Sequence, residues 1–220
     1  MKKLDLKYSK ILRGEFKPKK LNLLIVFQVN CPGCFVHAIP MAATLYEELK
    51  DNIGFFSLST AFEDFELNTI ENTEKMLDEG EMVGETRRAL LQRGIEKYPV
   101  KINFPVMFDL MEAPQNFMTE SFIISASEKI ENYDLLPSQK KKELAEQLYK
   151  YYSSHEKMGY SFIANMMKGT PTWIIFDKDM NIIDQKFGHV DKAELEDKLK
   201  ASPQNSPVEY FFDLQDFSVR

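Results

Sequence analysis

The sequence predicts an α/β fold, in which helices cover a sheet that contains parallel strands. Residues 21–30, LNLLIVFQVN, form a short apolar run rich in β-branched and aromatic residues, as expected of a strand buried on both faces. A helical pattern follows to about Lys50, and a second apolar run, residues 53–60, is typical of the next strand. A strand, a helix and a strand with short connections predict a parallel pair with a right-handed crossover.

Two helices are predicted after the second strand. Asn68 and Glu71 have the spacing of a capping box, and Gly80 is typical of a helix C-terminus. A shorter helix is predicted over residues 83–92. Residues 102–109, INFPVMFD, form an extended segment, and the proline in it favours an edge or irregular position because proline cannot donate to a ladder.

The last part of the chain predicts a long helix, a hairpin and a short helix. Residues 138–168 carry apolar side chains at steps of three and four, the pattern of one amphipathic helix that ends at Gly169. Residues 170–190 predict two strands joined by a tight turn. The short helix is expected to start near Asp191.

Composition and charge exclude several classes of function. The hydrophobic fraction of 44% and the charged fraction of 28% are those of an ordinary soluble globular protein. The net charge of −6 argues against nucleic acid as a partner, because binding it requires a positive field. No apolar stretch is long enough to cross a bilayer or to act as a signal peptide. We therefore expect a cytoplasmic protein that binds neither nucleic acid nor membrane.

We find no internal repeat and no low-complexity linker, which favours a single domain over residues 1–200. Residues 110–168 are interpreted as a helical insertion within it. Residues 201–220 contain two prolines and an aromatic cluster, and we expect a tail that packs back on the domain through Tyr210, Phe211 and Phe212.

Both cysteines of the chain lie within VNCPGCFVHAIP, residues 29–40. A disulfide this short would remove little entropy from the unfolded chain, so a structural role is disfavoured. A helix that begins at Cys31 places this thiol at a helix N-terminus, where unpaired N–H groups and the helix dipole stabilise a thiolate. Cys31 is therefore predicted as a nucleophile, and Cys34, one turn later, as the thiol that resolves a mixed disulfide.

The order of the elements and these motifs together resemble the thioredoxin fold. The C-x-x-C pair stands where the first of these strands meets its helix, and GTPTW places Thr170 and Pro171 where that superfamily has a cis-proline facing the cysteines. The segments FPVMFD and GTPTWIIFDKDMNIIDQKFG look like the TlpA-type branch, near the peroxiredoxins. The resemblance covers residues 21–60, 102–109 and 169–200, and the insertion has no family match.

The resemblance implies a central mixed sheet flanked by helices, with the insertion before the cis-proline strand. It implies a thiol–disulfide oxidoreductase whose redox-active disulfide, Cys31–Cys34, needs no bound cofactor. Pro171 and Thr170 would orient the substrate, with the Thr170 hydroxyl tuning Cys31. The expected partners are a disulfide-containing protein or small thiol as substrate, and an electron donor that reduces the pair again.

Several residues depart from the pattern of the superfamily or would modify its chemistry. Asn30 stands before the first cysteine instead of an aromatic residue, Pro40 comes six rather than five positions after the second, and Ile25 replaces a buried acid. The proline is expected to kink the helix. Pro32 and Gly33 leave room for a substrate and could tune the thiolate, and Pro32 lacks an N–H.

Alternative functions remain open for the same residues. Cys31 and Cys34, with His37 one turn later, could carry Zn(II) or Cu(I), although no fourth ligand is apparent and we predict no metal site. His37 is otherwise an exposed helix residue or a base for Cys34, and His155 is predicted in the core. A third possibility is an interaction module in which the insertion binds a partner and the cysteines are incidental.

Overall fold

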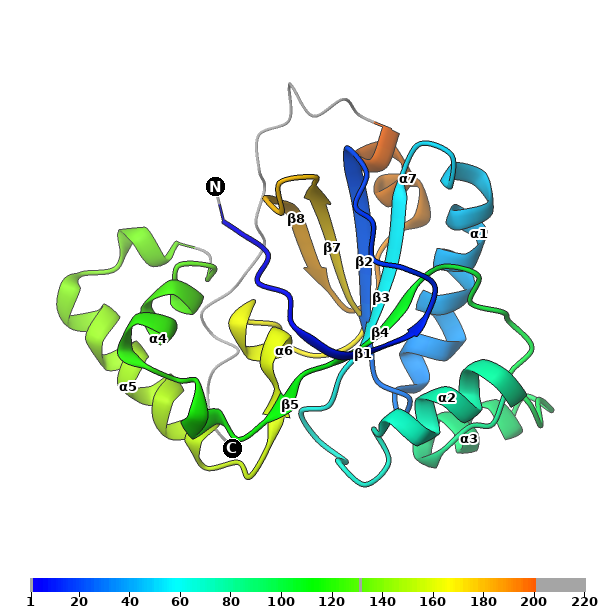
Figure 1. The fold of residues 1–220 in the computed structure, drawn as a ribbon, viewed down its shortest axis with the longest axis horizontal. Coiled ribbons are helices and arrows are strands. Elements are labelled where there is room, and N and C mark those ends of the chain that lie inside the picture. The colour runs from blue at the N-terminus through cyan, green and yellow to red at the C-terminus, as the bar shows by residue number, and fades with distance from the viewer. Residues whose placement is uncertain (1, 131, 201–220) are drawn as a thin grey trace.

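A six-stranded mixed sheet forms the centre of the structure, with helices on both faces (Figure 1). The structure is a computed structural model, and it describes residues 2–130 and 132–200. The strand order is β1-β4-β3-β2-β7-β8. These strands are β1 (Tyr8–Arg13), β2 (Leu21–Phe27), β3 (Gly54–Ser59), β4 (Val106–Asp109), β7 (Thr172–Asp177) and β8 (Ile182–Phe187).

The middle of the sheet has the predicted topology. β2 pairs with β3 in parallel and with β7 in antiparallel orientation, and β7 pairs with β8 as a hairpin. β4 is parallel to β3 and antiparallel to β1. α1 (Ile39–Leu49) connects β2 to β3, which confirms the strand, helix and strand unit. The hairpin turn is closed by Asp177, whose Oδ1 accepts the N–H groups of Asp179 and Asn181 at 2.9 Å each.

Each face of the sheet contributes to its own apolar cluster. Alternate residues of β2 belong to different clusters, Ile25 to one and Leu24 to the other, because successive side chains point to opposite faces. The first cluster includes residues of α1 and α7 (Lys192–Lys200), with α2 (Ile70–Glu79) and α3 (Gly84–Leu91) beside them. β2 is therefore apolar at every position but Asn22, since both of its faces are covered.

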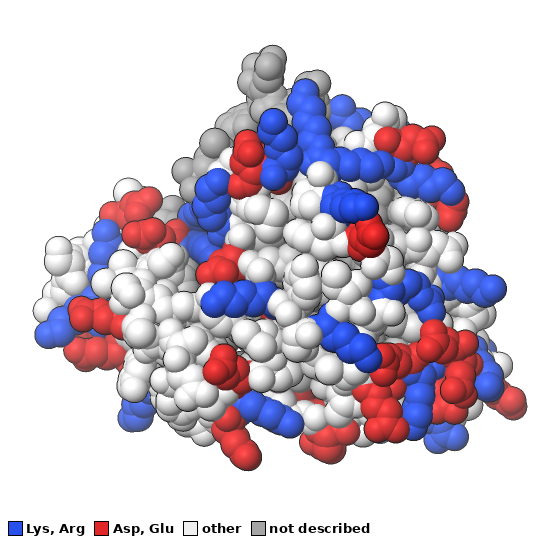
Figure 2. Space-filling view, viewed as in Figure 1, with Lys and Arg blue, Asp and Glu red and all other residues white. Residues whose placement is uncertain are grey.

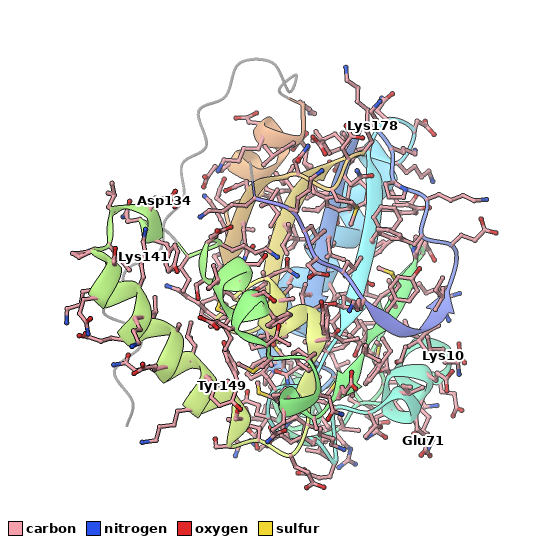
Figure 3. The ribbon with its side chains drawn as sticks, turned by 60° about the vertical axis from the view of Figure 1, so that its left-hand side comes forward. Lys10, Glu71, Asp134, Lys141, Tyr149 and Lys178 are labelled. Carbon is pink, nitrogen blue, oxygen red and sulfur yellow. A yellow bond between two sulfur atoms is a disulfide. The ribbon has the colours of Figure 1, made fainter. Side chains whose placement is uncertain are left out.

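The segment between β4 and β7 covers the second face. It contains a short antiparallel pair and three α-helices that stand to the left in Figure 1. Figure 3 shows Asp134, Lys141 and Tyr149 on this segment, where Nζ of Lys141 donates to the carbonyl oxygen of Asp134 at 3.3 Å. The elements are β5 (Met111–Glu112), η2 (Pro114–Asn116), α4 (Glu120–Ser127), η3 (Tyr133–Leu135), α5 (Ser138–Ser153), β6 (Met158–Gly159) and α6 (Tyr160–Ala164).

The prediction of one continuous helix over residues 138–168 is wrong. α5 ends at Ser153, and a short strand separates it from α6. The break occurs where the chain presses against the sheet: a side-chain carbon added at Gly159 would lie 2.4 Å from Oδ2 of Asp109. Met158 and Phe162 are both buried, so the apolar periodicity continues across the break although the helix does not.

Three smaller differences concern the edges of elements. The edge strand β1 was not predicted, because its residues are mostly exposed and lack an apolar pattern. β4 lies inside the sheet, and Pro105 precedes it, so the missing N–H removes no ladder bond from the strand. The cap of α2 is Thr69, whose Oγ1 accepts from Asn72 N at 3.1 Å, and Asn68 has another role described below.

Charges of both signs are mixed on the face shown in Figure 2, with acidic side chains gathered over α2 and α3 at the lower right. Within the described residues, no helix is both long and apolar enough to cross a membrane. The predicted tail contacts of Tyr210, Phe211 and Phe212 lie outside the described residues.

Candidate active site

Cys31 and Cys34 lie at the end of the sheet where β2 passes into its helix. The two residues form a disulfide, with their Cα atoms 5.3 Å apart. Cys31 is 9% exposed and Cys34 is fully buried. Cys31 is therefore the more accessible of the two, and its role as the nucleophile stays a prediction.

Two backbone groups border the sulfur of Cys31. The N–H of Cys34 donates to Sγ at 3.2 Å, and the carbonyl oxygen of Thr170 lies 3.4 Å from the same sulfur. In the reduced protein this Sγ would be a thiol or thiolate, and the Cys34 N–H would stabilise its negative charge. Pro32 and Gly33 are in the first helical turn, and Gly33 is exposed.

The loop before β7 faces the dithiol. The peptide bond between Thr170 and Pro171 is cis. A side-chain carbon added at Gly33 would lie 3.9 Å from Cδ of Pro171, which places the proline beside the C-x-x-C turn. The carbonyl oxygen of Pro171 accepts from Gly188 N at 2.8 Å, so the loop is tied to the end of β8. The Thr170 hydroxyl, expected to tune Cys31, instead donates to Gln28.

A widened helical turn follows the dithiol and explains the displaced proline. Residues Cys34–Ala38 form a π-helical segment, in which Ile39 N donates to the carbonyl oxygen of Cys34, five residues earlier. Pro40 then lies in the first turn of α1, where its missing N–H is not required. The π turn accommodates the additional residue between Cys34 and Pro40.

Asn30 holds the segment before Cys31 in place. Its side chain donates to Asp64 at 2.7 Å and accepts from Glu85 N at 2.6 Å, while its backbone N–H donates to Oδ1 of Asn68 at 2.9 Å. Gly84 packs closely on this side chain, since an added Cβ would lie 2.2 Å from its Oδ1. The close approach of Gly84 leaves no room for an aromatic side chain at this position, which gives the absence of one a structural reason.

The position of the buried acid in thioredoxins is apolar in this protein. Ile25 is fully buried, and its neighbours across the sheet are Ser57 and Trp173. The pKa of the Glu63 carboxyl is raised by its burial, with a smaller contribution from the charge of Asp64.

A buried carboxyl does lie at the same end of the sheet, on β4. Burial raises the pKa of Asp109 to about 6, against hydrogen bonds that lower it. Its oxygens accept from Thr60 Oγ1 at 2.7 Å and from the N–H groups of Ser161 and Phe162 at 2.9 and 3.2 Å. The bonds to Ser161 and Phe162 join the insertion to the sheet.

The three histidines lie in different surroundings. His37 and His189 are exposed, and their rings meet edge to face with centroids 5.5 Å apart. His155 is half-buried beyond the end of α5, and its Nδ1 lies 3.0 Å from the carbonyl oxygen of Tyr151, so it is not the core residue that the helical pattern predicts. In the described part of the chain, no group of three or more His, Cys, Asp or Glu residues could hold a metal ion.

Two solved structures are similar over almost the whole chain. A thiol-disulfide isomerase from Corynebacterium glutamicum has a TM-score of 0.56 at 19% identity, covering 91% of this chain and 96% of its own. A thioredoxin-like superfamily protein has a TM-score of 0.53 at 18% identity, covering 92% of this chain and 100% of its own. The chain has the thioredoxin fold.

The thioredoxin fold accounts for the placement of both motifs, because β2 leads into the dithiol and the cis-proline opens the strand that pairs with β2. No protein-family model and no curated protein sequence matches the chain. Two polar residues of this site, Gln28 and Asn68, were missed in the sequence analysis. Gln28 gave a signal, since it interrupts the apolar run of LNLLIVFQVN.

Proposed function

We propose that this chain is a thiol–disulfide oxidoreductase that reduces protein disulfides through Cys31 and Cys34. The observation that carries the proposal is the position of the Cys31 sulfur, between the Cys34 N–H and the Thr170 carbonyl beside the cis-proline. The structural likeness to a thiol-disulfide isomerase supports the same chemistry.

The reaction proceeds by two exchanges at sulfur. The Cys31 thiolate attacks one sulfur of the substrate disulfide, and the other substrate sulfur leaves as a thiolate. Cys34 then loses its proton and attacks Sγ of Cys31, which forms the intramolecular disulfide and releases the second substrate thiol. The substrate gains two electrons and the protein loses two. The substrate thiolate released first is a base that can take the proton of Cys34, since Ile25 provides none.

A separate electron donor must return two electrons to the Cys31–Cys34 disulfide after each cycle. The proposed compartment is the cytoplasm, whose thiol systems keep such pairs reduced. The backbone beside Pro171 would pair with a substrate in extended form.

The redox equilibrium of the pair with glutathione tests the proposal. Reversible formation of one intramolecular disulfide, with a potential near the value of about −270 mV found for thioredoxin, is expected for a reductase. A much more oxidising potential would mean that the pair donates disulfides. Failure of the pair to form a disulfide, together with stoichiometric uptake of Cu(I) or Zn(II) under anaerobic conditions, would replace the proposal with a metal carrier.

A further inference from the structure

Gln28 is a buried polar residue beside the dithiol that the exchange reaction does not use. It is the first residue after β2 and only 2% exposed. Buried amide groups are almost always hydrogen-bonded, so the partners of this side chain indicate its role. Both partners given by the structure belong to loops that border the site.

The acceptor end of the amide holds the cis-proline loop. The Thr170 hydroxyl donates to Oε1 of Gln28 at 3.2 Å. The carbonyl oxygen of the same threonine lies 3.4 Å from Sγ of Cys31. A bond to the Thr170 side chain therefore fixes the peptide group that stands directly beside the nucleophile.

The donor end of the amide holds a second loop. Nε2 of Gln28 donates to the carbonyl oxygen of Glu63 at 3.3 Å. The loop that contains Glu63 also positions Asn30, through Asp64 and through Asn68, whose own side chain donates to the Glu63 carbonyl at 3.0 Å. The loop that contains Glu63 thus anchors two segments of the site. It holds the segment before Cys31 through Asn30, and it holds the cis-proline loop through Gln28.

We propose that Gln28 is a positioning residue of the exchange site, whose amide holds the Thr170 peptide group where an extended polypeptide substrate pairs with it. The inference rests on the proposed function. It adds the residue that holds the substrate-pairing backbone in place, and it predicts that a small disulfide without peptide groups makes no use of this device. Gln28 acts through Thr170 and does not touch the reacting sulfur atoms.

Steady-state kinetics with two substrates test the role. The substrates are a fluorescent peptide with one internal disulfide, and cystamine, which has a disulfide but no peptide group. Gln28→Met keeps the length of the side chain without its hydrogen bonds, and Thr170→Val removes the hydroxyl. Thr170→Ser restores the hydroxyl, and Gln139→Met is the matched control at an exposed glutamine of α5.

Loss of the bond between Gln28 and Thr170 is expected to raise KM for the peptide about fivefold in Thr170→Val, and at least as much in Gln28→Met, which also loses the bond to the Glu63 carbonyl, with a smaller change in kcat. The ratio of kcat/KM for the peptide to that for cystamine falls accordingly. The double variant should match Gln28→Met, because the bond that Thr170→Val removes is already absent from that variant. Thr170→Ser should restore KM, and Gln139→Met should equal the parent.

Additive effects in the double variant, or an equal loss with cystamine and peptide, would overturn the positioning role. A measurement without catalysis decides the same question. Hydrogen exchange at Gly188 N, which donates to Pro171, should become faster in Gln28→Met and Thr170→Val alike, and unchanged exchange in both would contradict the proposal. If the parent reduces neither substrate, the proposed function fails, and the exchange result still decides whether Gln28 holds the loop.

Discussion

The backbone N–H of Cys34 points at the sulfur of Cys31 from 3.2 Å, so the fully buried cysteine donates to the more accessible one. This relationship makes the two cysteines unequal although they belong to one short motif. In the reduced protein this N–H would stabilise negative charge on Cys31, while the thiol of Cys34 would be withdrawn from solvent. Replacing Cys31 and replacing Cys34 should therefore have different effects on the exchange reaction.

Cys34→Ser should accumulate a mixed disulfide between Cys31 and substrate, because the nucleophile remains and the resolving thiol is absent. Cys31→Ser should form no such adduct, since Cys34 is buried. Intact-protein mass spectrometry after incubation with a disulfide-containing peptide distinguishes the two variants. Equal adduct formation by both would contradict the assignment of roles.

Asn30→Ala should lower the free energy of unfolding by about 1–2 kcal/mol, because it removes side-chain hydrogen bonds to Asp64 and to the N–H of Glu85. Asn103→Ala is the control, as this exposed side chain has only a 3.5 Å contact with Glu47 among its described bonds. Urea denaturation of the parent and both variants provides the comparison. Equal stability of the two variants would show that Asn30 does not anchor the loop.

The stability of the protein should depend on pH through Asp109. Burial raises its pKa from 3.8 to about 6, so between these values the folded protein binds more protons than the unfolded chain. The free energy of unfolding therefore falls as pH rises from about 4 to about 6, by at most about 3 kcal/mol. In Asp109→Asn this part of the pH dependence should vanish, with lower stability above about pH 6 because an amide nitrogen then faces N–H donors. Thermal unfolding across this range measures the difference, and parallel curves would refute it.

Lys129 should produce the opposite dependence at alkaline pH. Burial lowers its pKa from 10.5 to about 8, and its Nζ donates to Ala164 O at 2.6 Å and to Oδ1 of Asn165 at 3.0 Å. Between these pKa values the unfolded chain binds more protons, so the free energy of unfolding rises with pH through that range.

Lys129→Met removes this contribution. Because tyrosine ionisation affects both proteins alike, the difference between their urea-denaturation curves isolates the lysine. A constant difference from about pH 8 to about pH 10.5 would contradict the prediction.

The central strands were predictable because burial on both faces leaves a direct record in the sequence. β2 and β3 are buried at every position, and each corresponds to an apolar run. The periodicity over residues 138–168 was misleading for the same reason. It records that Met158 and Phe162 are buried, but the segment changes from helix to strand where Gly159 contacts the sheet, and that contact depends on Asp109, fifty residues earlier.

The site was predictable where its chemistry is local in the sequence. The two cysteines are three residues apart, and their motif together with GTPTW predicts a redox pair. Gln28 and Thr170 are 142 residues apart, and Asn30 and Asp64 are 34 apart. No spacing rule joins such residues, so these positioning contacts became visible only in the folded chain.

The π turn at Cys34–Ala38 has a consequence for how the chain tolerates insertions. One extra residue in an α-helix turns everything beyond it by about 100°, which would rotate Ala42 and Leu45 away from the sheet. The wider turn takes up that rotation locally, and both residues remain fully buried. The number of residues between the dithiol and α1 therefore does not decide which residues of α1 face the sheet. Removal of one residue between Phe35 and Ala38 should close the π turn into a regular α-helix and leave the core contacts of α1 where they are.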